Sequence, residues 1–299
     1  LPYNQREVTH MTLEAWLYQW VSLRSGGLRP RTIESYTSLI RLHIAPAIGC
    51  KKLAKLKPKH IAGMLQDIVA TGHTRTAELC FVLLRSALRS AVILRRIDWS
   101  PVDAVMRPAH TPQKGRAWTL EQTRIFLSAI AGHRHQLAWL LAVGMGLRRG
   151  EICGLRWSDV DLRAGILHVH SQRLRLADGR MVEAAPKSKA GTRDLPIPAP
   201  ILSVVRRRYQ FGTGFVVPIT PSALDAAHRT LMRKLPLPYI RFHDLRHTMA
   251  TNALRNGAAM RVLADVLGHS DPSVTAKFYT HPDFDMMART MDAAAVVMV

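Results

Sequence analysis

The sequence is poor in cysteine and has no long apolar run. Three cysteines occur in 299 residues, at positions 50, 80 and 153, and none belongs to a CxxC pair. This spacing excludes a disulfide framework and a cysteine-based zinc cluster, and it favours a reducing compartment. No apolar run reaches the ~18 residues that a membrane span needs. No signal peptide is visible either, so we expect a cytoplasmic protein without a membrane partner.

Acidic residues are also scarce relative to basic ones. Lys and Arg together number 42 and Asp and Glu number 21, which gives a net charge of +21. Such a surplus implies a polyanionic partner, with nucleic acid ahead of an anionic membrane. The surplus is not one basic tail, because residues 1–112 already carry 16 basic and 7 acidic residues. We therefore expect a partner that contacts both halves of the chain.

The first 105 residues have the pattern of a helical bundle. Apolar residues recur at helical spacing, and prolines or glycines stand between the periodic segments. Helices are predicted at about 12–24, from Pro30 onwards, at 58–69 and at 75–96. We expect Pro46 and Gly49 to stop the second of these helices.

Basic residues gather on this predicted bundle. Five lysines lie between positions 51 and 59, where a solvated loop and a phosphate-binding segment fit the pattern equally well. Arginines follow along the predicted helix at 75–96. The side chains expected to contact DNA are Lys51, Lys52, Lys55, Lys57, Arg85 and Arg89.

Residues 106–118 are predicted to be a linker, because they combine prolines, a glycine and basic residues. This divides the chain into a helical domain, 1–105, and a second domain, 119–299. Length and an apolar content of 47% allow each domain a core of its own.

The second domain mixes helices with a few strands. Thr119-Leu-Glu-Gln122 resembles a capping box and predicts a helix start. Alternation predicts strands at 165–172, 180–185 and 193–197, with a hairpin turn after Pro186. Further helices are predicted at 136–143, 200–209, 222–235, 243–256, 259–267, 273–280 and 285–298. The expected fold class is α+β, mostly helical, with a small antiparallel sheet in the second domain.

A possible phosphate site lies near the C-terminus. His243 and Arg246 are three residues apart, so they share a helix face. His269 and Tyr279 follow within a short span. An arginine fork and two imidazoles aimed at one point would hold a tetrahedral phosphate, and a nearby tyrosine would attack it.

Two further segments carry candidate residues. In Gly-Leu-Arg148-Arg-Gly-Glu151 the carboxylate of Glu151 is placed to reach nearby basic groups or backbone amides, although an ordinary surface ion pair is the simpler interpretation. A lysine at a hairpin tip, such as Lys189, is usually exposed and inert. It matters only if the tip reaches the phosphate.

Metal chemistry fits the sequence poorly. His243 and His247 have the spacing of a metalloprotease site, but Asp244 stands where the catalytic glutamate belongs. His168 and His170 alternate on a predicted strand and are expected at the surface. No carboxylate cluster suited to Mg²⁺ and no Walker-type glycine loop is apparent, so we expect neither a metal nor a cofactor.

These motifs together, in this order and spacing, resemble those of the tyrosine recombinases, the phage integrase family. The resemblance extends from about Thr12 to His281. It implies that Arg148 and Arg246 clamp the scissile phosphate, that His269 hydrogen-bonds one of its oxygens and that Tyr279 is the nucleophile. It also implies that His243 accepts the phenol proton, that Lys189 protonates the leaving 5′ oxygen, and that Glu151 buttresses the site. Lys187 is the alternative to Lys189 as the proton donor, and Arg149 is the weaker candidate for the phosphate clamp.

The resemblance also implies partners and a task. It implies a prokaryotic, DNA-associated integrase that joins two specific core sites in duplex DNA as a homotetramer, through a 3′-phosphotyrosine intermediate. Integration and excision of a mobile element is the expected task, and accessory DNA-bending or directionality proteins are compatible with it. A type IB topoisomerase and a non-catalytic DNA-binding regulator remain alternatives. The start at Leu1 leaves room for an arm-binding domain upstream.

Overall fold

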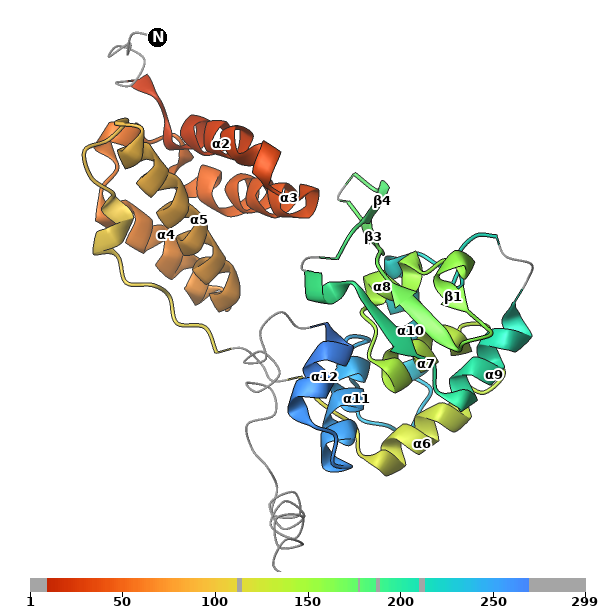
Figure 1. Cartoon of the computed structure of the whole chain (residues 1–299). Coiled ribbons are helices and arrows are strands. Elements are labelled where there is room, and N and C mark those ends of the chain that lie inside the picture. Colours follow the sequence, from red (N-terminus) through yellow and green to blue (C-terminus); the bar gives the residue numbers. More distant parts are fainter. Residues whose placement is uncertain (1–9, 112–114, 177, 187–188, 210–212, 269–299) are drawn as a thin grey trace, which may run out of the picture. The chain divides into compact units, whose positions relative to one another are not determined.

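The computed structural model describes residues 10–111, 115–176, 178–186, 189–209 and 213–268 of the chain (Figure 1). Contacts divide the chain into two compact units, Leu1–Gln113 and Lys114–Val299. The boundary falls inside the segment whose composition predicts a linker. No helix in the described ranges is long and apolar enough to cross a membrane.

The main elements in the described part of the first unit are all helices (Figure 1). Its main helices are α2 (Leu13–Arg24), α3 (Pro30–Leu39), α4 (Pro58–Ala70) and α5 (Thr74–Ile93). Thr12 caps α2 by accepting a hydrogen bond from the backbone N–H of Ala15.

The second helical segment ends at Gly49, as predicted, but the prediction that Pro46 stops it is wrong. After α3 the chain continues as a π-helix, Ile40–Gly49, with Pro46 inside it. Proline removes one backbone donor, which normally ends a helix. Here Ile40, Ile44 and Ile48 are at most 3% exposed. Burial of these side chains stabilises the helix on both sides of the proline.

Two tryptophans of α2 organise the core of this unit. Trp16 and Trp20 are almost fully buried. Their indole N–H groups donate to the Ala87 carbonyl and the Ser90 hydroxyl of α5, each at 3.0 Å. Each buried ring is thereby satisfied at its polar edge, which fixes α2 against α5.

The second unit combines a helical body with two small antiparallel sheets (Figure 1). One sheet has the order β1-β2-β5, from Val160–Asp161, Ile166–Val169 and Arg193–Pro196. The other pairs β3 (Gln172–Arg175) with β4 (Met181–Ala184). The helices are α6 (Leu120–Ala129), α7 (Gln136–Met145), α8 (Arg149–Gly154), α9 (Ala199–Arg208), α10 (Pro221–Met232), α11 (Asp244–Arg255) and α12 (Met260–Leu267).

Two strand predictions need correction. The single strand expected at 165–172 is divided, because β2 ends at Val169 and β3 starts at Gln172 in the other sheet. The hairpin expected after Pro186 is absent from the described residues, because β5 pairs with β2 and β4 pairs with β3. Burial decides this pairing: Leu167 and Leu195 face each other across β2 and β5 and are both buried.

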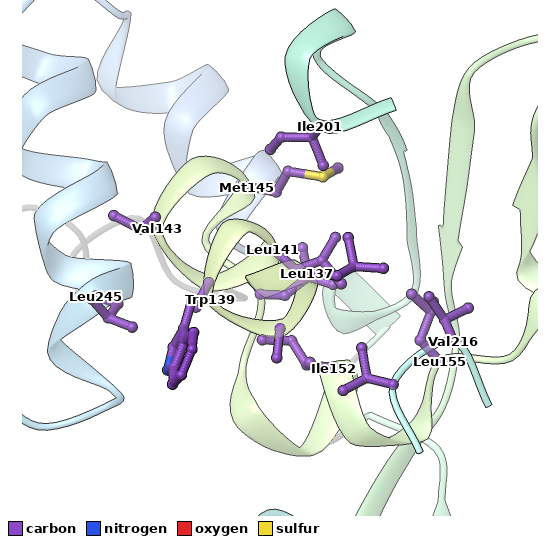
Figure 2. Packing of buried hydrophobic residues seen from close by; sticks show 14 of the residues in the cluster. Leu137, Trp139, Leu141, Val143, Met145, Ile152, Leu155, Ile201, Val216 and Leu245 are labelled. Carbon is purple, nitrogen blue, oxygen red and sulfur yellow. The ribbon is translucent and has the colours of Figure 1, made fainter. Parts of the chain in front are cut away.

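Helix α7 lies at the centre of the second core. Trp139 and Leu141 are fully buried, and Figure 2 shows the labelled α7 side chains with Leu245 of α11 on one side and Ile201 of α9 on the other. Helices α11 and α7 pack closely against each other. This packing brings the start of α11 near the end of α7, where the candidate site lies.

Candidate functional site

The Arg148–Glu151 pair lies at the start of α8. The Glu151 carboxylate accepts the Arg148 backbone N–H at 2.9 Å and the Arg148 Nη1 at 2.7 Å. Glu151 is 2% exposed, so the interpretation as an ordinary surface ion pair is excluded. The carboxylate caps the helix and fixes the Arg148 guanidinium at the same time.

Arg193 of β5 is a second partner of Glu151. Its Nη2 lies 3.1 Å from Glu151 Oε2. Burial raises the pKa of Glu151, but the Arg193 and Arg148 guanidinium groups outweigh this and hold the pKa below its usual value. The carboxylate is therefore ionised at neutral pH and can orient both arginines.

Arg246 enters the site from α11. The helix starts at Asp244, whose carboxylate accepts the Arg241 backbone N–H at 2.9 Å. Arg246 is 4% exposed. Its Nη1 donates to the Gly146 carbonyl at 2.7 Å and its Nη2 to the Leu267 carbonyl at 2.5 Å. These bonds tie α11 to the ends of α7 and α12.

Arg148 and Arg246 converge on the C-terminal end of α12. Arg148 Nη2 donates to the Gly268 carbonyl at 3.0 Å, next to the Leu267 carbonyl that Arg246 contacts. The next residue in the chain is His269, which lies outside the described residues, as does Tyr279. Both arginines therefore contact the two residues that directly precede His269 in the chain.

Arg148 and His243 line one pocket of about 470 Å³. Arg149, Asp225, Tyr239 and Arg241 are also in its wall. Three other described candidates, Arg246, Lys189 and Glu151, are not among the lining residues. Arg149 forms an ion pair with Asp225.

The His243 imidazole is neutral at pH 7. Burial by surrounding atoms, together with repulsion from His247 and Arg246, lowers the pKa of His243 to about 4. By surface area the residue is nevertheless exposed to solvent. A neutral imidazole is able to accept a proton.

Lys189 lies on a short 3-10 turn, Lys189–Gly191, and is exposed. This turn packs against the end of α12. A Cβ built on Gly268 would lie 2.7 Å from the Ala190 carbonyl oxygen, and Gly268 has φ +64. The Lys189 turn therefore lies at the end of α12, which Arg148 and Arg246 also contact. The turn belongs to a loop that joins the two sheets and not to a hairpin. The alternative, Lys187, lies outside the described residues.

Residues 120–286 match the phage integrase family, and residues 12–68 match the phage integrase N-terminal SAM-like domain. The first match alone covers more than half of the chain. The chain belongs to the phage integrase family. The resemblance seen in the motifs is confirmed, and so is the mostly helical fold with a small antiparallel sheet.

Individual relatives agree with this assignment. A tyrosine recombinase XerC-like protein of Caldanaerobacter subterraneus is 30% identical over 191 residues, which cover 54% of this chain and 49% of the relative. The chain thus spans about half the length of that protein. The putative prophage phiRv2 integrase of Mycobacterium tuberculosis is 26% identical over 279 residues, which cover 89% of this chain and 72% of the relative.

Solved structures share the fold. The Tn1549 transposon integrase in complex with a circular intermediate DNA superposes with a TM-score of 0.80 at 22% identity, over 95% of this chain and 100% of that one. A lambda integrase tetramer bound to a Holliday junction has a TM-score of 0.70 at 21% identity, over 93% of this chain and 80% of that one.

The basic residues predicted to contact DNA lie on the first unit of this integrase-family chain. Lys52, Lys55 and Lys57 are exposed and Lys51 is half-buried. Arg85 and Arg89 of α5 are about half exposed, and both contact Asp103, at 3.6 and 3.3 Å. A DNA phosphate would therefore have to compete with the Asp103 carboxylate for either arginine.

The remaining candidate histidines have local partners. His168 lies 2.7 Å from an Asp194 oxygen, and His170 lies 2.9 Å from an Asp159 oxygen. In the described part of this integrase-family chain, no three His, Cys, Asp or Glu side chains are grouped to hold a metal ion.

Sequence reasoning missed Arg193 as a site residue. A signal was present, because strand periodicity places Arg193 on the same face as Leu195, and Leu195 is buried. A charged residue on the buried face of a strand needs a buried partner. In this integrase-family chain that partner is Glu151.

The end of α7 gives a test of how closely the site is packed. Gly146 ends α7 with φ +68, and a Cβ there would lie 2.9 Å from Leu267 Cδ2. Gly132 has φ +71 but no atom within 4 Å of such a Cβ. Gly132→Ala should lower the free energy of unfolding by about 1–2 kcal/mol through backbone strain alone.

Gly146→Ala should lower the free energy of unfolding further, by about 1–3 kcal/mol beyond Gly132→Ala, because it also overpacks the contact with α12. Urea unfolding of the two variants measures the difference. Equal losses would show that the end of α7 is not in tight contact with Leu267.

Proposed function

We propose that this chain is a site-specific DNA recombinase of the integrase type, which cuts and rejoins strands through a 3′-phosphotyrosine intermediate. One observation carries the proposal: Arg148, Arg246 and the Lys189 turn come from distant parts of the sequence and meet at the end of α12. His269 follows directly in the chain, and Tyr279 follows ten residues later.

The proposed cleavage is a balanced transfer. The Tyr279 oxygen bonds to phosphorus while its proton passes to the neutral His243. The bond from phosphorus to the 5′ oxygen breaks, and Lys189 supplies the proton for the departing hydroxyl. Arg148, Arg246 and His269 neutralise the charge that builds on the non-bridging oxygens.

Joining is the same reaction in reverse. The 5′-hydroxyl of a second strand attacks the phosphotyrosine and releases Tyr279. Because one phosphodiester is exchanged for another, the bond energy is conserved and no nucleotide needs to be hydrolysed. Four such exchanges on two DNA sites complete recombination, which is why we propose a homotetramer.

Duplex DNA is the proposed substrate. The charge of +21 suits a polyanion, and we expect the exposed lysines of the first unit to contact phosphates. Integrases with the same fold have been solved with circular intermediate DNA and with a Holliday junction. Integration and excision of a mobile element is the task we propose, and prophage and transposon integrases among the relatives support it.

A nicked suicide substrate tests this function. Cleavage next to the nick frees a short oligonucleotide, so the covalent intermediate cannot be resealed and accumulates. We expect a protein–DNA adduct in EDTA, resolved on a denaturing gel. A joining assay with two sites then separates a recombinase, which needs both, from a topoisomerase, which relaxes one DNA. DNA binding without an adduct on any candidate site would contradict the proposal and favour a regulator.

The low pKa of His243 predicts a flat pH profile. The second-order rate constant for adduct formation reports ionisation in the free protein. An acceptor with the ordinary histidine pKa near 6.5 would lose about tenfold in rate between pH 7.5 and 5.5. Because the pKa of His243 is lowered, the imidazole stays neutral in that window, and we expect less than about a twofold loss from this group.

Reactions with limiting protein, stopped at successive times and resolved on denaturing gels, measure this rate. DNA affinity is determined at each pH. His243→Gln, which has no titratable imidazole, gives the background profile. A tenfold fall that disappears in His243→Gln would show that His243 titrates in its ordinary range.

A further inference from the structure

The Arg193 guanidinium touches three segments of the second unit at once. Its Nε donates to the Val266 carbonyl of α12 at 2.6 Å, and its Nη1 donates to the Gly191 carbonyl at 2.9 Å. Its Nη2 donates to Glu151 Oε2 at 3.1 Å. These partners belong to the helix before His269, to the turn that carries Lys189, and to the residue that holds Arg148.

The end of α12 is held by three arginines on successive carbonyls. Arg193 contacts the Val266 oxygen, Arg246 the Leu267 oxygen and Arg148 the Gly268 oxygen. The last carbonyls of a helix lack partners within the helix and carry its partial negative charge, so cations satisfy them. The position of the chain entering His269 is thus fixed by the same residues that form the candidate site.

Stability alone does not explain Arg193. Its side chain is 8% exposed and that of Glu151 is 2% exposed. A buried ion pair gains little over well-packed apolar residues, because both charges lose their hydration. Apolar packing is possible on this face of β5, as buried Leu195 shows. An apolar residue, however, cannot donate hydrogen bonds to Val266, Gly191 and Glu151 at the same time.

The Lys189 turn has little freedom to shift in this packing. A Cβ on Gly268 would lie 2.7 Å from the Ala190 oxygen and 3.0 Å from Arg193 Nη1. The turn, the end of α12 and the Arg193 guanidinium therefore meet without an intervening side chain. A displacement of Arg193 would move the turn relative to Arg148.

We propose that Arg193 is a positioning residue for strand cleavage, which fixes the Lys189 turn and the end of α12 in place relative to the Arg148–Glu151 pair. The inference rests on the proposed recombinase function. Arg193 acts through its neighbours, and chiefly through the turn: it sets where Lys189 delivers its proton.

Arg193→Lys separates positioning from charge. Lysine keeps a cation beside Glu151, but a single ammonium cannot reproduce the planar fork to three partners. We expect the rate of adduct formation at saturating protein to fall about 100-fold, the lower range for loss of general acid catalysis. DNA affinity should change little, and the unfolding temperature, although lowered by the lost hydrogen bonds, should stay above the assay temperature. The matched control is Arg180→Lys, an exposed arginine paired with Asp178, which should react like the wild type.

A substrate with sulfur in place of the bridging 5′ oxygen gives the decisive readout. A thiolate leaves without protonation at neutral pH, because thiols are far more acidic than alcohols. If Arg193 positions Lys189, the deficit of Arg193→Lys should shrink at least tenfold on this substrate. A deficit of equal size on both substrates, or no deficit on the oxygen substrate, would overturn the proposal.

A second variant and the wild-type result separate a failure of the positioning role from a failure of the recombinase proposal. Should Arg193→Lys unfold below the assay temperature, Arg193→Gln provides the second variant, since it keeps a donor for Glu151; the same comparison of substrates applies. If the wild type forms no adduct on either substrate, the recombinase proposal itself fails. If the wild type and Arg180→Lys form adducts and Arg193→Lys shows no deficit, only the positioning role fails.

Discussion

Tyr279→Phe is expected to abolish covalent attachment to DNA and to leave DNA binding unchanged. Phenylalanine keeps the ring but removes the oxygen that would bond to phosphorus, so no intermediate can form. The suicide substrate, run on a denaturing gel, should show adduct for the wild type and none for the variant. A mobility-shift assay with the same DNA should give equal affinities.

Tyr239 provides a stringent control for this assignment. It lines the pocket with Arg148 and His243, and it is half exposed. Its phenol is therefore the described tyrosine best placed to be mistaken for the nucleophile. Tyr239→Phe should still form adduct. If Tyr239→Phe loses the adduct and Tyr279→Phe keeps it, the nucleophile has been assigned wrongly.

Arg148→Ala is expected to lower the rate of adduct formation by about 10²–10³-fold at saturating protein, the usual loss for one preorganised charge-stabilising donor. The fold should survive, because Glu151 retains Arg193 as a partner. Single-turnover kinetics with the suicide substrate give the rate, and circular dichroism checks the fold.

The neighbouring Arg149→Ala is the matched variant. Arg149 also lines the pocket, but it pairs with Asp225 rather than with Glu151. Removing it should slow the reaction by less than about tenfold, mostly through weaker DNA contact. Equal losses in the two variants, or a larger loss for Arg149→Ala, would reverse the assignment between these adjacent arginines.

Local signals in the sequence predicted much of the second unit correctly. Thr119 and Gln122 form the reciprocal capping box that their spacing predicts, with bonds of 3.2 and 3.0 Å. Glu151 reaches the Arg148 amide three residues away, as a short helix requires. These interactions span three residues, so the sequence alone contains all the geometry they need.

Features that depend on distant partners were predicted less well. The Lys189 segment has the composition of a hairpin turn, but β5 pairs with β2, and a local pattern does not choose between partners. Pro46 has the local signature of a helix stop, which burial of the surrounding isoleucines overrides. The role of Arg193 depends on Glu151, forty-two residues earlier, and no local pattern links them.

Mass spectrometry of the adduct tests the central claim most directly. The wild type would be trapped on the suicide substrate in EDTA, treated with nuclease and digested with trypsin. Cleavage after Lys277 and Arg289 gives a peptide in which Tyr279 is the one tyrosine. We predict that this peptide carries a nucleotide linked by its 3′ phosphate to Tyr279. A nucleotide on any other residue, or no linked peptide despite tight DNA binding, would contradict the account.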